Sequence, residues 1–175
     1  MKSISRLLPL ILLLSSLSLH AEVKRPVMPV HTKEGDVVYG RKFGVALTLD
    51  VVKPEKPNGF GIVYMVSGGW VSGYSPNTPD YYVPFLERGY TVFSVRHGCQ
   101  PKFIIPEITQ DIHRAIRFIR HNASKWNVNP DKLGISGGSA GGHLSLTMGV
   151  YGGPGDPKAK DLIDRESSAI QAIAC

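Results

Sequence analysis

Cysteine is scarce in this sequence, and its scarcity excludes two kinds of architecture. Cys99 and Cys175 are the only cysteines among 175 residues. Two widely separated thiols cannot build a disulfide scaffold, although an exported protein could form a single bridge. No cysteines and histidines have the spacing of a zinc site. The sequence therefore predicts a protein without a bound metal, and no motif indicates another cofactor.

Long apolar runs are missing too, because the most apolar segment, Leu7 to Leu19, has only 13 residues. A helix that crosses a bilayer needs about 20, so no stable membrane anchor is expected. Lys2 and Arg6 precede the run and the small residue Ala21 follows it, an order typical of a secretory signal peptide. We interpret residues 1–21 as a cleaved signal, with an uncleaved anchor as the alternative, and expect a periplasmic or secreted protein.

Charge of one sign is not in strong excess either. Removal of residues 1–21 takes away Lys2 and Arg6 and no acidic residue, so 18 basic side chains remain against 14 acidic ones. The densest basic cluster falls on the polar side of a predicted helix and is typical of a solvated face, so no nucleic-acid partner is expected. Its members are His113, Arg114, Arg117, Arg120 and His121.

What the sequence does have is an alternation of strand-like and helix-like segments. Short apolar runs are typical of strands buried on both faces, and apolar residues spaced by three and four indicate helices. Such alternation predicts an α/β fold with a mostly parallel sheet. The predicted strands cover 60–66, 90–95, 133–136 and 168–175, and the predicted helices cover 80–89, 106–123 and 140–150.

An antiparallel hairpin is predicted ahead of this sheet. Strand-like runs over 37–39 and 45–51 flank Gly40 and Gly44, which indicates two strands joined by a longer loop. The preceding residues contain prolines and charges without periodicity and are interpreted as an extended lead-in. The chain is thus divided into the signal (1–21), the lead-in (22–36) and one folded domain (37–175).

Two glycine-rich segments directly follow predicted strands, and the carboxyl ends of parallel strands are where ligands bind. The earlier segment runs from Ser67 to Trp70 and follows the third predicted strand. The later one matches the pattern G-x-S-x-G, with a strand before it and a helix after it. It consists of Gly137, Gly138, Ser139, Ala140 and Gly141.

The later segment has the context of a nucleophile elbow, in which a sharp turn lifts Ser139 to the top of the sheet. The glycines leave room around the serine, and the amide of Ala140 opens a helix, where it faces negative charge. The alternative is a glycine-rich helix start that binds phosphate or packs closely. A dinucleotide site, however, would have its glycine-rich turn after the first strand.

The earlier segment lies where an enzyme with such an elbow has the other half of its oxyanion hole. Two backbone amides that converge on a developing oxyanion together stabilise it by several kcal/mol. An ordinary Gly-Gly turn is the alternative interpretation.

Three stretches resemble the acetyl-esterase and lipase branch of the α/β-hydrolases: 63–73 (VYMVSGGWVSG), 111–122 and 133–143 (LGISGGSAGGH). They are similar to exported bacterial proteins grouped with feruloyl and acetyl-xylan esterases. The resemblance implies the α/β-hydrolase fold and a small-molecule or carbohydrate ester as the substrate. It also implies that Ser139 is the nucleophile and that backbone amides form the oxyanion hole, namely those of Gly69, Trp70 and Ala140.

Two features depart from the family pattern. Many relatives have His-Gly-Gly where this chain has Ser67-Gly68-Gly69, which leaves the backbone donors in place. In this fold the triad acid and base follow the nucleophile on later loops, and the sequence stops at Cys175. We therefore expect an incomplete sheet without the triad acid and base, and little hydrolysis of p-nitrophenyl acetate by these 175 residues. Robust turnover that Ser139→Ala abolishes would contradict this expectation.

No residue is a convincing substitute for the missing base. His143 lies on the helix that leaves the elbow and is expected to pack toward the sheet or a loop, while His97 lies nearer the rim of the site. Asp111 is interpreted as a surface acid and Cys99 as a space-filling residue. Three acids that follow the nucleophile helix precede the expected position of the triad acid: Asp156, Asp161 and Asp164.

Three hypotheses follow. The first is an exported serine-dependent carboxylic-ester hydrolase that acts through an acyl-enzyme, on acylated carbohydrate by family analogy. The second is an inactive, truncated hydrolase that serves as an interaction module, because an uncovered sheet edge favours a partner. The third, a peptidase of the prolyl-oligopeptidase type, is disfavoured because only a short lead-in precedes residue 37.

Overall fold

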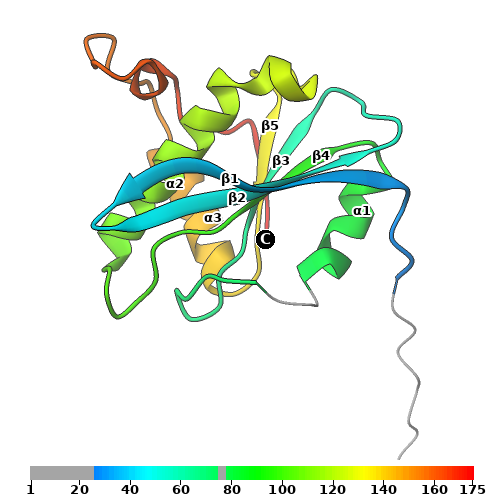
Figure 1. Ribbon diagram of the computed structural model, residues 1–175, viewed down its shortest axis with the longest axis horizontal. Helices are drawn as coiled ribbons and strands as arrows, with labels where there is room; N and C mark the ends of the chain where they lie inside the picture. The colour runs from blue at the N-terminus through cyan, green and yellow to red at the C-terminus, as the bar shows by residue number, and fades with distance from the viewer. Residues whose placement is uncertain (1–25, 75–77) are drawn as a thin grey trace, which may run out of the picture.

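The computed structural model describes residues 26–74 and 78–175. The predicted signal peptide, residues 1–21, lies outside the described residues. The described chain forms one six-stranded sheet in the order β1-β2-β4-β3-β5-β6 (Figure 1). The strands are β1 (His31–Lys42), β2 (Val45–Pro54), β3 (Gly61–Met65), β4 (Thr91–Val95), β5 (Leu133–Ser136) and β6 (Ala172–Ala174).

The sheet joins an antiparallel edge to a parallel remainder. β1 pairs antiparallel with β2, and β2 pairs antiparallel with β4. β3 is parallel to both β4 and β5, and β5 is parallel to β6. This arrangement confirms the predicted α/β class with an antiparallel N-terminal hairpin.

The hairpin differs from the prediction in its turn and in its start. A two-residue turn of Phe43 and Gly44, with φ angles of 46° and 77°, replaces the predicted longer loop. Positive φ at both central positions matches the twist of the two strands, so β1 continues through Gly40, which pairs with Leu47. β1 also begins at His31, so the last residues of the predicted lead-in belong to the sheet.

Helices cover both faces of the sheet (Figure 1). α2 (Ile105–His121) and α3 (Ala140–Tyr151) lie on one face, and η1 (Thr78–Tyr82) and α1 (Val83–Leu86) lie on the other. The short η2 (Ala123–Trp126) and η3 (Leu162–Arg165) complete the set. Among the described residues, no helix is both long enough and apolar enough to cross a membrane.

The helix predicted over 80–89 is much shorter in the structure. A 3₁₀ turn leads into an α-helix of four residues, with Pro84 in its first turn. Gly89 ends the segment with φ of 82°, a conformation that glycine adopts without a steric penalty. The apolar spacing in this segment is therefore satisfied by two short turns rather than by one helix.

Alternation along β4 shows how the sheet separates two apolar layers. Phe93 and Val95 contribute to the large cluster that contains the apolar residues of α2 and α3, whereas Val92 contributes to the smaller cluster with η1 and α1. The predicted apolar face of α2 is fully buried in the first cluster. It consists of Ile108, Ile112, Ala115, Ile116 and Ile119.

The basic side of α2 is not the solvated face that its sequence predicts. Arg114 forms ion pairs with Asp161 at 2.7 Å and with Asp164 at 2.8 Å. Arg120 donates to the carbonyl oxygens of Ser167 and Ala169. The segment that follows α3 therefore covers this face and neutralises part of its charge, which the helical spacing alone does not reveal.

Candidate active site

Ser139 lies at the junction of β5 and α3 in a strained backbone conformation. Its φ and ψ are 53° and −123°, outside the regions that residues with a side chain usually occupy. Such a conformation costs about 1–3 kcal/mol and persists only where the surrounding structure enforces it. The residue is exposed and its side chain makes no capping hydrogen bond to α3. The turn therefore presents a free hydroxyl above the carboxyl end of β5.

Two of the predicted elbow glycines are required by close backbone contacts. A Cβ atom on Gly141 would lie 2.6 Å from the carbonyl oxygen of Met65 in β3, and one on Gly137 would lie 2.8 Å from the backbone of Gly141. Gly138 differs, because a Cβ atom there would meet nothing within 4 Å. The glycines that flank the serine at two residues thus allow α3 to approach the sheet.

The segment after β3 forms a tight turn. Gly68 and Val71 exchange two backbone hydrogen bonds of 3.0 Å, and the central residues Gly69 and Trp70 have φ angles of 56° and 59°. A positive φ is unusual for a residue as large as tryptophan. The two bonds of the turn use the amides of Gly68 and Val71, so the predicted donor amides of Gly69 and Trp70 stay outside this pairing.

The two glycine-rich segments are joined directly. The amide of Gly141 donates to the carbonyl oxygen of Ser67 at 3.2 Å. The ring of Trp70 packs edge-on against that of His143, with 5.7 Å between centroids. His143 therefore packs on a loop, as predicted, and holds α3 against the turn.

A single pocket of about 660 Å³ opens between the two segments. Its polar edge includes Ser67, Gly68 and Ser139, whereas Gly69, Trp70 and Ala140 are the chain neighbours of this lining. The rest of the lining is mainly apolar and aromatic. It contains Tyr64, Tyr81, Pro84 and Phe85.

The lining of this pocket contains no histidine and no carboxylate. His97 lines a different cavity, is 5% exposed, and its Nδ1 lies 2.7 Å from the carbonyl oxygen of Gly98. Asp111 is not the predicted surface acid, because it is buried and forms an ion pair with Lys42 at 2.6 Å. The structure therefore brings neither residue to the serine.

Cys99 does more than fill space. Its Sγ accepts a hydrogen bond from the amide of Ser72 and donates one to the Ser72 carbonyl oxygen, both at 3.1 Å. Cys99 and Cys175 are both free thiols, so the single bridge that export would permit is not formed.

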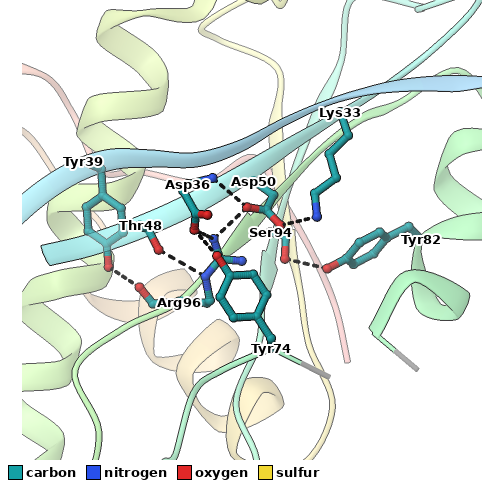
Figure 2. A network of polar contacts seen from close by, with 9 residues as sticks. All are labelled: Lys33, Asp36, Tyr39, Thr48, Asp50, Tyr74, Tyr82, Ser94 and Arg96. Atoms are coloured by element: carbon teal, nitrogen blue, oxygen red, sulfur yellow. Dashed lines mark hydrogen bonds and ion pairs between the residues drawn. The ribbon is translucent and has the colours of Figure 1, made fainter. Parts of the chain in front are cut away.

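The sequence patterns do not predict a polar network that lies beside the loop after β3. Arg96, at the end of β4, donates to Asp50 at 2.7 Å, to Asp36 at 3.2 Å and to Thr48 at 3.1 Å (Figure 2). Burial alone would raise the pKa of Asp50, but hydrogen bonds from Arg96 and Lys33 outweigh it and lower that pKa. The sequence feature that indicates such a network is the presence of single charged residues within or beside otherwise apolar strands.

The buried His97 and the half-buried His113 predict a fold that loses stability in mild acid. Burial lowers the pKa of both His97 and His113 below the ordinary value of about 6.5. As the pH falls, the unfolded chain therefore takes up protons on these histidines before the folded chain does. The contribution of the two neutral histidines to the free energy of unfolding is fully present above about pH 6.5 and decreases as the pH falls toward the folded pKa values. We expect the urea midpoint to decrease between pH 8 and pH 5, less steeply in His113→Gln. A midpoint that stays constant over this range would contradict the prediction.

Several known proteins are similar to this chain in sequence. A sequence profile of the BD-FAE family matches residues 49–174. The chain is 26% identical over 147 residues to LipM, a probable carboxylic ester hydrolase of Mycobacterium tuberculosis. This match covers 81% of this chain and 33% of LipM. The chain is also 36% identical over 108 residues to an acetylxylan esterase of Xylanibacter ruminicola. This match covers 56% of this chain and 21% of that esterase.

Solved structures show the same fold. A truncated carbohydrate esterase from gut microbiota is 27% identical with a TM-score of 0.71, over 86% of this chain and 58% of that one. The esterase Est2 of Thermogutta terrifontis is 28% identical with a TM-score of 0.66, over 85% of this chain and 53% of that one. The chain thus spans a third or less of these two curated relatives and a little over half of these solved esterases.

Proposed function

Since this chain belongs to the BD-FAE family and has the α/β-hydrolase fold, we propose that it is the nucleophile-bearing part of a carboxylic ester hydrolase. The observation that carries the proposal is the backbone of Ser139, held in a strained turn between a strand and a helix with its hydroxyl exposed. Strain of this kind is retained where it serves the chemistry of a site. Ester hydrolysis uses it by presenting the hydroxyl to a carbonyl carbon.

In the proposed reaction, the Ser139 hydroxyl attacks the ester carbonyl and the alcohol leaves, which gives an acyl-enzyme that water then hydrolyses. The negative charge on the tetrahedral intermediates would be stabilised by the amides of Gly69, Trp70 and Ala140. A histidine must take the serine proton and return it to the leaving alcohol. None of the residues that line the pocket supplies it. Because the chain spans only part of the length of its esterase relatives, we propose that the base and its carboxylate correspond to the part of those relatives that this chain does not span.

The proposed substrates are esters whose acyl or alcohol part packs against an apolar wall. Tyr81 and Phe85 line the same pocket as the serine, and rings of this kind pack against both sugars and aromatic acyl groups. The names of the acetylxylan esterase and the carbohydrate esterase support acylated carbohydrate as the substrate class. We propose export through the segment 1–21, which would bring the enzyme to such polymers.

Covalent labelling tests the nucleophile directly. The complete gene product is incubated with paraoxon, which phosphorylates esterase 2 of Thermogutta terrifontis, and its peptides are analysed by mass spectrometry. We expect one diethylphosphoryl group on Ser139, together with hydrolysis of p-nitrophenyl acetate and acetylated xylan. Labelling at another residue, or a folded protein that neither reacts nor hydrolyses any ester, would contradict the proposal.

A further inference from the structure

The loop that follows β3 (residues 67–74) is held along its length by the segment that follows β4. The amide of Gln100 donates to the carbonyl oxygen of Trp70 at 3.2 Å, and Cys99 exchanges two hydrogen bonds with Ser72. Farther along the loop, the guanidinium of Arg96 lies 4.3 Å from the ring centroid of Tyr74. Every second residue of the loop from position 70 to position 74 therefore contacts residues 96–100.

Arg96 is a rigid platform for the last of these contacts. Three acceptors hold its guanidinium, and two of them, Asp50 and Thr48, belong to the neighbouring strand β2 (Figure 2). Its side chain is only 10% exposed. A guanidinium fixed in this way offers one face to an aromatic ring without losing further side-chain entropy.

Tyr74 docks on this platform although the contact buries little of it. Its hydroxyl donates to the carboxylate of Asp36, which Arg96 also contacts (Figure 2). The residue nevertheless remains 69% exposed and belongs to neither apolar cluster. The contact of Tyr74 with Arg96 and Asp36 therefore contributes little to the core.

We propose that Tyr74, docked between Arg96 and Asp36, is a positioning residue that holds the turn of Gly69 and Trp70 in the orientation required for oxyanion stabilisation. The inference rests on the proposed esterase function. Donor amides stabilise an oxyanion only when they are already oriented toward it, and the positive φ angles at both central positions of the turn relax once the loop is released. Tyr74 itself does not line the pocket beside Ser139, so its effect is on the transition state rather than on substrate binding.

Kinetics of the complete gene product test this role. In Tyr74→Ala we expect kcat to decrease about tenfold while KM changes less than about twofold. A trifluoromethyl ketone, which forms a tetrahedral adduct with the serine, should bind more weakly by the same factor as the loss in kcat/KM. Tyr74→Phe keeps the ring over Arg96 and loses only the hydroxyl, so its kcat should lie between that of Tyr74→Ala and that of the parent protein. The matched control is Tyr151→Ala, because Tyr151 is 71% exposed on α3, and it should behave as the parent protein does.

The outcomes distinguish a failure of this inference from a failure of the proposed function on which it rests. Unchanged kcat and inhibitor affinity in Tyr74→Ala, or a rise in KM alone, would overturn the positioning role. If the parent protein shows no turnover that depends on Ser139, the proposed function fails, and hydrogen exchange at the hydrogen-bonded amides of Val71 and Gln100 then tests the docking of the loop by itself. Faster exchange in Tyr74→Ala than in Tyr151→Ala supports docking of the loop, and equal exchange overturns it.

Discussion

Ser139→Ala is expected to abolish ester hydrolysis by the complete gene product, with a decrease in kcat of about 10⁴- to 10⁶-fold. The reason is that the variant has no oxygen to form the acyl-enzyme, so only oriented water and the donor amides remain. The measurement is steady-state hydrolysis of p-nitrophenyl acetate at saturating substrate. Thermal stability should change little, because the serine side chain is exposed and makes no capping hydrogen bond.

Ser124→Ala provides the control for this experiment. Ser124 is also exposed, but it lies in η2 and does not line the pocket. Its variant should keep the kcat of the parent protein. Turnover by Ser139→Ala within tenfold of the parent value would show that another residue is the nucleophile.

Gly141→Ala is expected to lower the free energy of unfolding by about 3 kcal/mol. The added methyl group would lie 2.6 Å from the carbonyl oxygen of Met65, and backbone atoms of a central strand cannot move aside as a flexible side chain can. The helix α3 must then shift away from β3, which also disturbs the hydrogen bond from the Gly141 amide to Ser67. Urea unfolding followed by circular dichroism measures the loss of stability, and ester hydrolysis should fall with it.

Gly138→Ala is the matched control, since it lies in the same turn and its added methyl group meets nothing within 4 Å. We expect its free energy of unfolding to remain within about 0.5 kcal/mol of the parent value. Equal destabilisation by the two substitutions would mean that the turn tolerates no side chain at either position. The close approach of α3 to β3 would then not be the cause.

Local patterns were sufficient for the class of fold and for the position of the glycine-rich turn between β5 and α3. β5 begins and ends where its apolar run predicted, and the buried face of α2 follows the spacing of its isoleucines. The glycine-rich turn lies between β5 and α3, as the order of strand, turn and helix in the sequence indicated. These features depend on residues that are neighbours along the chain, so a pattern of period two, three or four is enough to identify them.

Partners distant in the sequence decided the rest. Arg96 reaches Asp36 across 60 positions and Asp50 across 46, and Arg114 meets Asp164 across 50. Asp111 is polar and lies on a helix, yet its place beneath Lys42 and Gly98 buries it. The sequence specifies the formal charge of each residue. Its burial and its ion-pair partner depend on which strands and loops pack together, so only the tertiary structure determined how the loop of Gly69 and Trp70 is anchored.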